Sequence, residues 1–347
     1  MVNSLIKRAK TFRKAQYFKT GLYQTQKKYA FIGMGMHSLT NLYPVLKHYG
    51  INLKYIYTKS SSWDKQIRML FPDCIYTNNI EDLLNDAEVE GIFISASPSS
   101  HFELLKRCLQ KFKKIFIEKP PCQSVTELEE LTRINDKGVC KVGLQRRYWP
   151  ANKILNKKVK KTNSYTYSFH TGSYIEGDVF TELFIHPLDY VLFLFGTATI
   201  KSSSVIKDDS GITVHLHLLH KNGISGMIEC SSQHNWNNPT DQLMINSAKE
   251  LLTVNYPTSI AGEIKPGRIM NIPTERILNT KIVRNQYFSS NNFILPVAEL
   301  NTIYLQGFYN ELETFVNIVE GTHPEHIKND LPGLINVYKM IDQLKTN

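Results

Sequence analysis

Residues 28–39 read Lys-Tyr-Ala-Phe-Ile-Gly-Met-Gly-Met-His-Ser-Leu. The apolar run Tyr29–Gly33 predicts a β-strand, and the amphipathic stretch Leu39–Tyr49 predicts a helix. Gly33 and Gly35 lie in the turn between them. Glycines at such a junction let the backbone turn tightly and approach a pyrophosphate at the helix N-terminus. The segment therefore predicts a dinucleotide-binding unit, with an ordinary strand–helix turn as the alternative.

The alternation of buried strand and amphipathic helix continues to about residue 150. Ser124 and Glu127 form a capping box before one of the helices. Strands that alternate with helices are typical of a doubly wound parallel sheet, so we expect an α/β Rossmann fold here. The further strands are expected at 51–57, 91–96, 114–117 and 140–144, and the further helices at 80–85, 102–109 and after Ser124.

After Pro150 the pattern changes to strand-like segments separated by turns such as Lys221-Asn222-Gly223. This pattern predicts an α+β domain with an open, largely antiparallel sheet. We therefore divide the chain into a basic N-terminal extension (1–28), a Rossmann domain (29–150) and a second domain (151–347). Within the second domain, strands are expected at 165–170, 212–219, 224–230 and 251–254, and helices at 304–319 and 334–344.

The composition is that of an ordinary globular protein. Hydrophobic residues make up 42% and charged residues 21% of the 347 residues, which excludes disordered and collagen-like classes. The longest uncharged apolar run, near Tyr190–Gly196, is shorter than the roughly 20 residues of a membrane span. Residues 1–28 lack the apolar core of a secretory signal. We therefore expect a cytoplasmic protein.

The net charge of +10 is concentrated at the N-terminus. Residues 1–28 hold eight of the 41 Lys and Arg residues and no acid, which leaves 33 basic against 31 acidic residues, a net of +2, in the rest. A nearly neutral body argues against nucleic-acid binding. The extension either contacts an anionic membrane or an acidic partner, or it packs on the protein's own surface or frays, and we favour the second interpretation. A short apolar stripe suits one face of a helix there: Leu5, Ile6, Ala9 and Phe12.

The sequence gives no strong metal signal. His215 and His217 share one face of an expected strand, with His220 just beyond, but no cysteine or acid joins them at ligand spacing. We therefore expect no metal site. The cysteines are scattered without any C-x-x-C pair, which argues for reduced, buried thiols: Cys74, Cys108, Cys122, Cys140 and Cys230.

The end of the second expected strand bears on the type of cofactor. An NAD-binding unit usually carries an acid there, which binds the ribose hydroxyls. This chain has Thr58, Lys59 and Ser60 instead, and the next acid is Asp64. A lysine and hydroxyls suit a 2′-phosphate, because they supply charge and donors. We therefore expect NADP(H), with NAD(H) as the alternative.

Glu118-Lys119-Pro120 follows the expected strand 114–117. Ligands bind outside the carboxyl ends of the strands in open α/β sheets. A lysine at that edge can reach the nicotinamide ribose and the reacting hydroxyl. Its charge favours the alkoxide-like form of an alcohol during hydride loss.

Glu182, His186 and Asp189 are spaced i, i+4 and i+7, which places them on one face of a helix. An imidazole flanked by two carboxylates is a good general acid or base. Two alternatives remain: a satisfied core histidine at a domain interface, and a metal site, since carboxylate and imidazole both bind metals.

These motifs together resemble the Gfo/Idh/MocA family of nicotinamide-dependent oxidoreductases, from about Tyr29 to the C-terminus. The ordered set is more specific than any one motif. It comprises Phe31-Ile32-Gly33-Met34-Gly35, Ala96-Ser97-Pro98 with His101 and Glu103, Glu118-Lys119-Pro120-Pro121, Val142–Pro150, Glu182 with His186 and Asp189, and Phe308 with Glu311-Leu312 and Phe315.

The resemblance implies a substrate-binding and oligomerisation domain after the Rossmann domain, and therefore a homo-oligomer. By position, His186 exchanges the proton of the reacting oxygen, Glu182 stands at the family's aspartate, and Lys119 contacts cofactor and substrate. Tyr174, in a loop before Glu182, either contacts substrate or lies in a surface loop. The candidate cofactor residues are Gly33, Gly35, Met36, His37, Thr58, Lys59, Ser60, Ser97, Pro98, His101, Glu118, Lys119, Arg146 and Arg147, and the candidate substrate residues are Lys119, Tyr174, His186 and Asp189.

Three positions depart from the family pattern. Glu182 replaces the commoner aspartate, and its longer side chain could reposition the acid. Ser38 replaces a third glycine or alanine. The segment between Pro98 and His101 is one residue shorter than the commonest form.

From these features we expect an NADP(H)-preferring oxidoreductase that acts on a sugar, a nucleotide-linked sugar or a cyclitol. Two alternatives keep the fold. One is an enzyme that retains its cofactor and uses transient redox, as some glycoside-cleaving relatives do. The other is a non-catalytic, dinucleotide-sensing regulator, against which the joint presence of Lys119, Glu182 and His186 argues.

Overall fold

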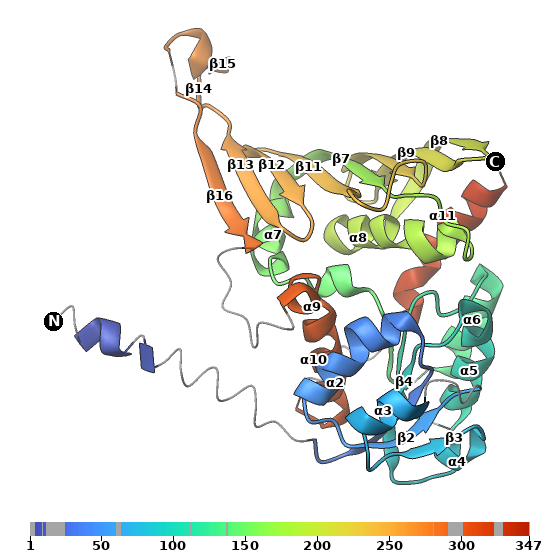
Figure 1. Ribbon diagram of the computed structural model, residues 1–347. Helices are drawn as coiled ribbons and strands as arrows, with labels where there is room; N and C mark the ends of the chain where they lie inside the picture. The colour runs from blue at the N-terminus through green and yellow to red at the C-terminus, as the bar shows by residue number, and fades with distance from the viewer. Residues whose placement is uncertain are drawn as a thin grey trace. The chain divides into compact units, whose positions relative to one another are not determined.

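The computed structural model describes the chain as two compact units, each containing one large sheet (Figure 1). The first unit comprises Met1–Tyr148 and Ile294–Ile335, and the second comprises Trp149–Phe293 and Asn336–Asn347. The segment Ile294–Ile335, which the sequence assigned to the second domain, thus groups with the first. The described residues are 4–8, 10–11, 25–59, 64–111, 113–136, 138–279, 281–290, 301–322 and 329–346.

The sheet of the first unit is parallel throughout, in the order β3-β2-β1-β4-β5-β6. This confirms the predicted doubly wound Rossmann sheet. Ile32 pairs with Tyr57 on one side and with Ile94 on the other, so three strands end at the same edge. The strands are β1 (Lys28–Ile32), β2 (Leu53–Tyr57), β3 (Ile75–Thr77), β4 (Val89–Ile94), β5 (Lys114–Ile117) and β6 (Cys140–Val142).

Helices cover both faces of this sheet. In Figure 1, α2 and α10 lie on one side and α5 and α6 on the other. On the first side an aromatic core joins sheet to helix, with the rings of Phe93 and Phe315 5.1 Å apart at 76°. The helices are α2 (Tyr43–His48), which follows a π-helical turn at Ser38–Leu42, α3 (Asp64–Leu70), α4 (Glu81–Leu84), α5 (Pro98–Gln110), α6 (Val125–Ile134), α9 (Asn301–Leu305) and α10 (Phe308–Val319).

Two helix ends test the local predictions. The capping box before α6 is confirmed, because Ser124 Oγ accepts the Glu127 N–H at 3.2 Å. The single helix expected over Tyr304–Val319 is wrong: α9 and α10 are separate. Gly307 lies between them with φ of 95°, a left-handed conformation that a helix interior does not adopt.

The sheet of the second unit is mostly antiparallel, as predicted, in the order β16-β13-β12-β11-β7-β10-β9-β8. Only the β7–β10 pair is parallel among the pairs the structure describes in this sheet. The strands are β7 (Thr162–His170), β8 (Ala198–Asp208), β9 (Gly211–His220), β10 (Ser225–Ser231), β11 (Thr240–Ser247), β12 (Glu250–Asn255), β13 (Ser259–Ile264) and β16 (Arg284–Ser289), with a small β14 (Arg268–Ile269) and β15 (Ile272–Pro273) hairpin.

One face of this second sheet packs against α8 (Ile185–Phe195), where the rings of Tyr165 and Phe195 stack 4.6 Å apart (Figure 1). His220 is buried there and bonds the Tyr165 hydroxyl through Nε2 at 2.9 Å, whereas His215 is exposed. On β9, His220 therefore faces the core and His215 faces solvent. The other helices of the second unit are α7 (Asn152–Lys158) and the end of α11 (Leu331–Lys345), which begins in the first unit.

The N-terminal extension is described only in part. Residues 4–8 are helical, and Leu5 and Ile6 are exposed. Ala9 and Phe12, the other members of the expected apolar stripe, lie outside the described residues. Across the described part of the chain, no helix is long and apolar enough to cross a membrane.

Candidate functional site

The turn after β1 requires its first glycine. Gly33 has φ of 112°, and a Cβ there would lie 2.0 Å from the backbone oxygen of Ser95. Its N–H donates to Tyr57 O at 2.9 Å, which ties the turn to the end of β2. Gly35 differs, since a Cβ there would meet no atom within 4 Å. The second glycine therefore borders open space, as the approach of a pyrophosphate requires.

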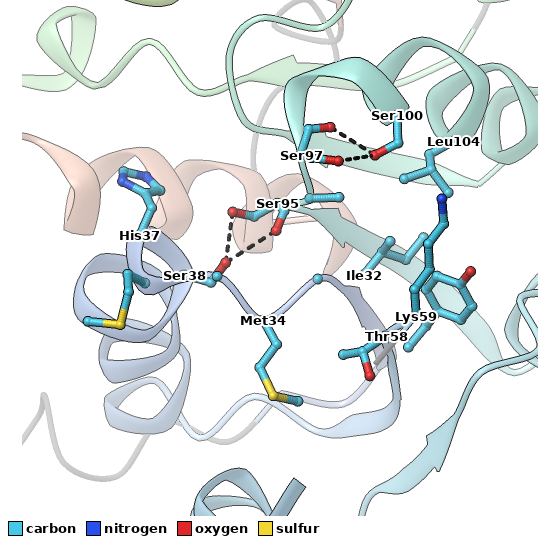
Figure 2. Close-up of a pocket in the computed structure, with 15 residues that line it drawn as sticks. Ile32, Met34, His37, Ser38, Thr58, Lys59, Ser95, Ser97, Ser100 and Leu104 are labelled. Carbon is cyan, nitrogen blue, oxygen red and sulfur yellow. Dashed lines mark hydrogen bonds between the residues drawn. The ribbon is translucent and has the colours of Figure 1, made fainter. Parts of the chain in front are cut away.

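That space is a cavity of about 500 Å³ at the carboxyl ends of β1, β2 and β4 (Figure 2). Ser38, at the place of the third small residue, is buried beside it and donates to Ser95 Oγ at 2.8 Å. The serine thus fixes the first helix turn to the end of β4. The lining residues are Ile32, Gly33, Met34, Gly35, Met36, His37, Ser38, Tyr57, Thr58, Lys59, Ser95, Ala96, Ser97, Ser100 and Leu104.

Lys59 is the lysine of this lining, and no carboxylate is among the described residues that form it. Figure 2 places Thr58 and Lys59 on the side of the cavity away from His37. The predicted cofactor residues that line the cavity are Gly33, Gly35, Met36, His37, Thr58, Lys59 and Ser97. Ser60 lies outside the described residues, and the lining does not include Pro98, His101, Glu118, Lys119, Arg146 or Arg147.

Glu118 is buried directly after β5 and reaches toward the cavity rim. Its Oε1 lies 3.3 Å from His37 Nε2. Burial opposes ionisation of this carboxyl, but the charge and hydrogen bond of His37, with smaller contributions from Lys119 and His101, hold its pKa below its usual range. A Cβ at Gly143 would lie 2.7 Å from Glu118 Oε2, so that glycine leaves room for the carboxylate.

A second buried carboxyl, Glu311 of α10, lies in the same region. Its Oε1 accepts the Leu144 N–H at 2.5 Å, and its Oε2 has no hydrogen-bond partner among the described residues. Burial, followed by repulsion from Glu118, raises the pKa of Glu311 well above its usual range. Burial thus favours the neutral form of Glu311, whereas His37 favours the ionised form of Glu118.

The remaining predicted residues of the first unit have varied surroundings. His101 is buried on α5. Its Nδ1 lies 2.7 Å from the backbone oxygen of Pro120, the residue after Lys119. Arg147 Nη1 lies 3.6 Å from Asp330, which also accepts from Lys141 Nζ at 2.7 Å. Arg146 is buried in the 3₁₀ turn Gln145–Tyr148, Lys119 is half-buried, and Pro98 begins α5.

In the second unit, Glu182 is buried and held at both carboxylate oxygens. The Tyr174 hydroxyl donates to Oε2 at 2.6 Å, and the Asp178 N–H donates to Oε1 at 3.1 Å. His186 and Asp189 are both buried on α8, one and two helical turns further along. The structure thus places the three expected members of the helix face, and Tyr174, in one unit.

Tyr174 also lines a cavity of about 830 Å³ in this unit, between the loop 173–180 and the ends of β8 and β9. The charged residues of its lining are Asp178, Lys207, Asp208, Asp209 and Lys345. No group of three or more His, Cys, Asp or Glu side chains suited to a metal occurs among the residues the structure describes.

Sequence reasoning missed several of these neighbours. Gly177 and the Asp178 N–H shape the surroundings of Glu182, but a backbone contact leaves no sequence pattern. Ser95 and Ser100 also line the cavity. They lie within two positions of the Ala96-Ser97-Pro98 segment after β4, so the sequence could have indicated them.

The comparisons with known proteins agree with the Rossmann fold of the first unit. Residues 27–145 match the family model GFO_IDH_MocA, described as "Oxidoreductase family, NAD-binding Rossmann fold". Over 100 residues the chain is 28% identical to the scyllo-inositol 2-dehydrogenase (NADP(+)) IolW of Bacillus subtilis, which covers 28% of each chain. The chain spans between 29% and 53% of the length of three other curated relatives, all uncharacterized oxidoreductases.

Solved structures share the fold over most of the chain. A dehydrogenase from Chromobacterium violaceum aligns with a TM-score of 0.78 at 16% identity, covering 92% of this chain and 94% of that one. A 3-ketoreductase from Actinomadura kijaniata, in complex with TDP-benzene and NADP, aligns at 0.70 and 13% identity, covering 92% and 97%. Residues 27–145 are thus similar to the NAD-binding Rossmann domain of the Gfo/Idh/MocA oxidoreductase family, whose model they match.

Proposed function

We propose that the protein is an NADP(H)-preferring oxidoreductase. It transfers hydride between the nicotinamide and a carbinol or keto carbon of a sugar, a nucleotide-linked sugar or a cyclitol. The observation that carries this proposal is the cavity beside Gly33 and Gly35, because its glycine turn suits a dinucleotide.

The preference for NADP(H) rests on the end of β2. Lys59 and Thr58 line the cavity, and its described lining contains no acid to bind ribose hydroxyls. A 2′-phosphate bound there would contact a cation and a hydroxyl donor. The ribose hydroxyls of NAD would find no carboxylate to accept their hydrogen bonds. Two of the similar proteins are named with NADP, the Bacillus dehydrogenase and the Actinomadura ketoreductase.

The proposed chemistry gives each of three side chains one role. When bound, the nicotinamide supplies the hydride acceptor or donor. His186 takes the hydroxyl proton in oxidation and returns it in reduction, while Glu182 orients the imidazole. Lys119 polarises the reacting oxygen, since a cation favours its alkoxide-like form. Further cofactor contacts are proposed for Pro98, His101, Glu118, Arg146 and Arg147, which do not line the cavity, and for Ser60, which lies outside the described residues.

The substrate class has separate support. Tyr174 and several charged side chains line the 830 Å³ cavity of the second unit, and such groups suit a polyhydroxylated ligand. We assign substrate contacts to Tyr174, which lines this cavity, and also to His186, Asp189 and Lys119, which are not part of its lining. The names of the relatives agree with a sugar-like substrate, an inositol in one and a 3-ketoreductase substrate in another.

A turnover screen tests this function. The purified chain is incubated with NADPH and a panel of ketosugars, keto-cyclitols and nucleotide-linked ketosugars, and NADPH loss is followed by absorbance. Saturable oxidation of NADPH by a member of the panel supports the proposal. Product formation without net NADPH loss would favour the cofactor-retaining alternative, and dinucleotide binding without any turnover would favour the regulator.

A further inference from the structure

The loop before Glu182 is built around its carboxylate. We propose that Tyr174, Gly177 and the Asp178 N–H form a cradle that positions the Glu182 carboxylate, so that an acid longer than the family's aspartate can orient His186. This inference rests on the proposed function. It assigns Gly177 as a positioning residue, which acts on the reaction through Glu182. The Tyr174 hydroxyl has the same role, in addition to the substrate contact proposed for that side chain.

The cradle contacts both oxygens of Glu182 from one loop. Tyr174 donates to Oε2 at 2.6 Å and Asp178 N–H donates to Oε1 at 3.1 Å. A Cβ at Gly177 would lie 2.0 Å from Oε1 and 2.7 Å from Cδ. The space that a side chain at 177 would occupy is therefore filled by the end of the glutamate.

The donor hydroxyl stays protonated at neutral pH. Burial, then the hydrogen bond to Glu182, raises the pKa of Tyr174 well above its usual range. The Tyr174 hydroxyl therefore remains a hydrogen-bond donor to the Glu182 carboxylate at and around neutral pH.

The loop that carries the cradle is itself anchored. The Asp178 carboxylate accepts from the Thr181 hydroxyl at 2.7 Å and from Lys345 Nζ at 2.6 Å. Asp178 O accepts the Glu182 N–H at 2.9 Å, which joins the loop to the π-helical turn Phe180–Phe184. Such anchoring fixes the donors in place before substrate binds, as a positioning role requires.

A glycine variant separates positioning from folding. At Gly177 the clashing atom is the end of a flexible side chain and not backbone, so Gly177→Ala should displace the carboxylate and keep the fold. We expect kcat to fall about tenfold or more, with the KM for NADPH unchanged. Gly267→Ala is the matched control, because a Cβ there meets only Thr274 Cγ2, at 3.9 Å, and it should leave kcat unchanged.

The decisive comparison is a double-mutant cycle with the shorter acid. In Glu182→Asp the carboxylate withdraws from Gly177, so adding Gly177→Ala should then cost less than about twofold in kcat. Equal costs of Gly177→Ala in both backgrounds would overturn the cradle. Tyr174→Phe removes a donor to the carboxylate and should lower kcat with the KM for NADPH unchanged, whereas an unchanged kcat would exclude a role for the hydroxyl.

A measurement without turnover keeps this inference separate from the proposed function. Tyrosine ring ¹³Cζ NMR, with the Tyr174 signal assigned by its loss in Tyr174→Phe, should show a shift of that signal in Glu182→Gln. An unchanged signal would overturn the cradle. A shifted signal in a protein that turns over no substrate would support the cradle and overturn only the enzymatic function.

Discussion

The carboxylate of Glu118 lies 3.3 Å from His37 Nε2 and joins the end of β5 to the rim of the dinucleotide cavity. Glu118 is buried, whereas His37 is partly exposed and lines the cavity. The imidazole is thus held between a buried negative charge and the space where a diphosphate would bind. His37 therefore joins the buried carboxylate to the wall of the cavity.

The first prediction concerns the contribution of His37 to cofactor binding. His37→Ala removes a side chain that lines the cavity, so it should weaken the binding of NADPH and of NADH by a similar factor, about threefold or more. The two cofactors share the diphosphate, which is the part expected beside His37. Calorimetric titrations of both proteins with both cofactors check this. Unchanged affinities would exclude a contact between His37 and the cofactor.

The second prediction concerns cofactor selectivity. Lys59→Ala should weaken NADPH binding by about tenfold, about 1.4 kcal/mol, because it removes the cation expected to face the 2′-phosphate. NADH binding should change little. Lys47→Ala, an exposed lysine on α2 that is not part of the cavity lining, is the matched control. Equal losses for NADPH and NADH would contradict the assignment of Lys59 to the 2′-phosphate.

The third prediction concerns proton transfer. His186→Ala should lower kcat by about 10²–10⁴-fold, because it removes the proposed general acid and base. NADPH affinity should be retained, since His186 belongs to the second unit and the cavity to the first. Steady-state kinetics and a binding titration on the same preparation check both parts. Turnover at the wild-type rate would remove His186 from the mechanism.

The fourth prediction concerns stability. Because the pKa of Glu311 is raised in the folded state, the folded chain retains a proton that the unfolded chain loses above a pH of about 4.3. The unfolding free energy should therefore fall with rising pH, by at most about 1.4 kcal/mol per pH unit from this group. Glu311→Gln removes this dependence, so its stability relative to wild type should increase between pH 5 and 8.

Glu118 contributes with the opposite sign. Its pKa is lowered in the folded state, so its contribution is present above its ordinary range and is lost as the pH falls through the lowered value. The two carboxyls therefore act in different windows. Urea unfolding of wild type and of Glu311→Gln, measured from about pH 5 to 8, checks the Glu311 prediction. A difference in unfolding free energy that does not vary with pH would contradict it.

The sequence predicted the parts of the fold that depend on local chemistry. The glycine turn at Gly33 and the cap at Ser124 are determined by residues within a few positions, and both occur where expected. Strand β8 was missed, because it is an edge strand whose Lys-Ser-Ser-Ser segment shows little apolar alternation. The break at Gly307 was also missed, since apolar spacing continues on both sides of it.

The candidate site was predictable in its residue types but not in its contacts. Sequence spacing placed Glu182 and His186 on one helix, but it gave no sign that Tyr174 and Gly177 enclose the carboxylate. Likewise Glu311 was noted only as part of a motif. The rise of its pKa depends on burial and on Glu118, a residue nearly 200 positions earlier in the chain.

Binding of NADP(H) in the cavity beside Gly33 is measured by titrating the cofactor-free, folded protein with NADPH and NADH in parallel and following nicotinamide fluorescence. We expect saturable binding of both cofactors, with NADPH bound about tenfold or more tightly. Tighter binding of NADH would contradict the 2′-phosphate assignment, and binding of neither cofactor would contradict the dinucleotide site itself.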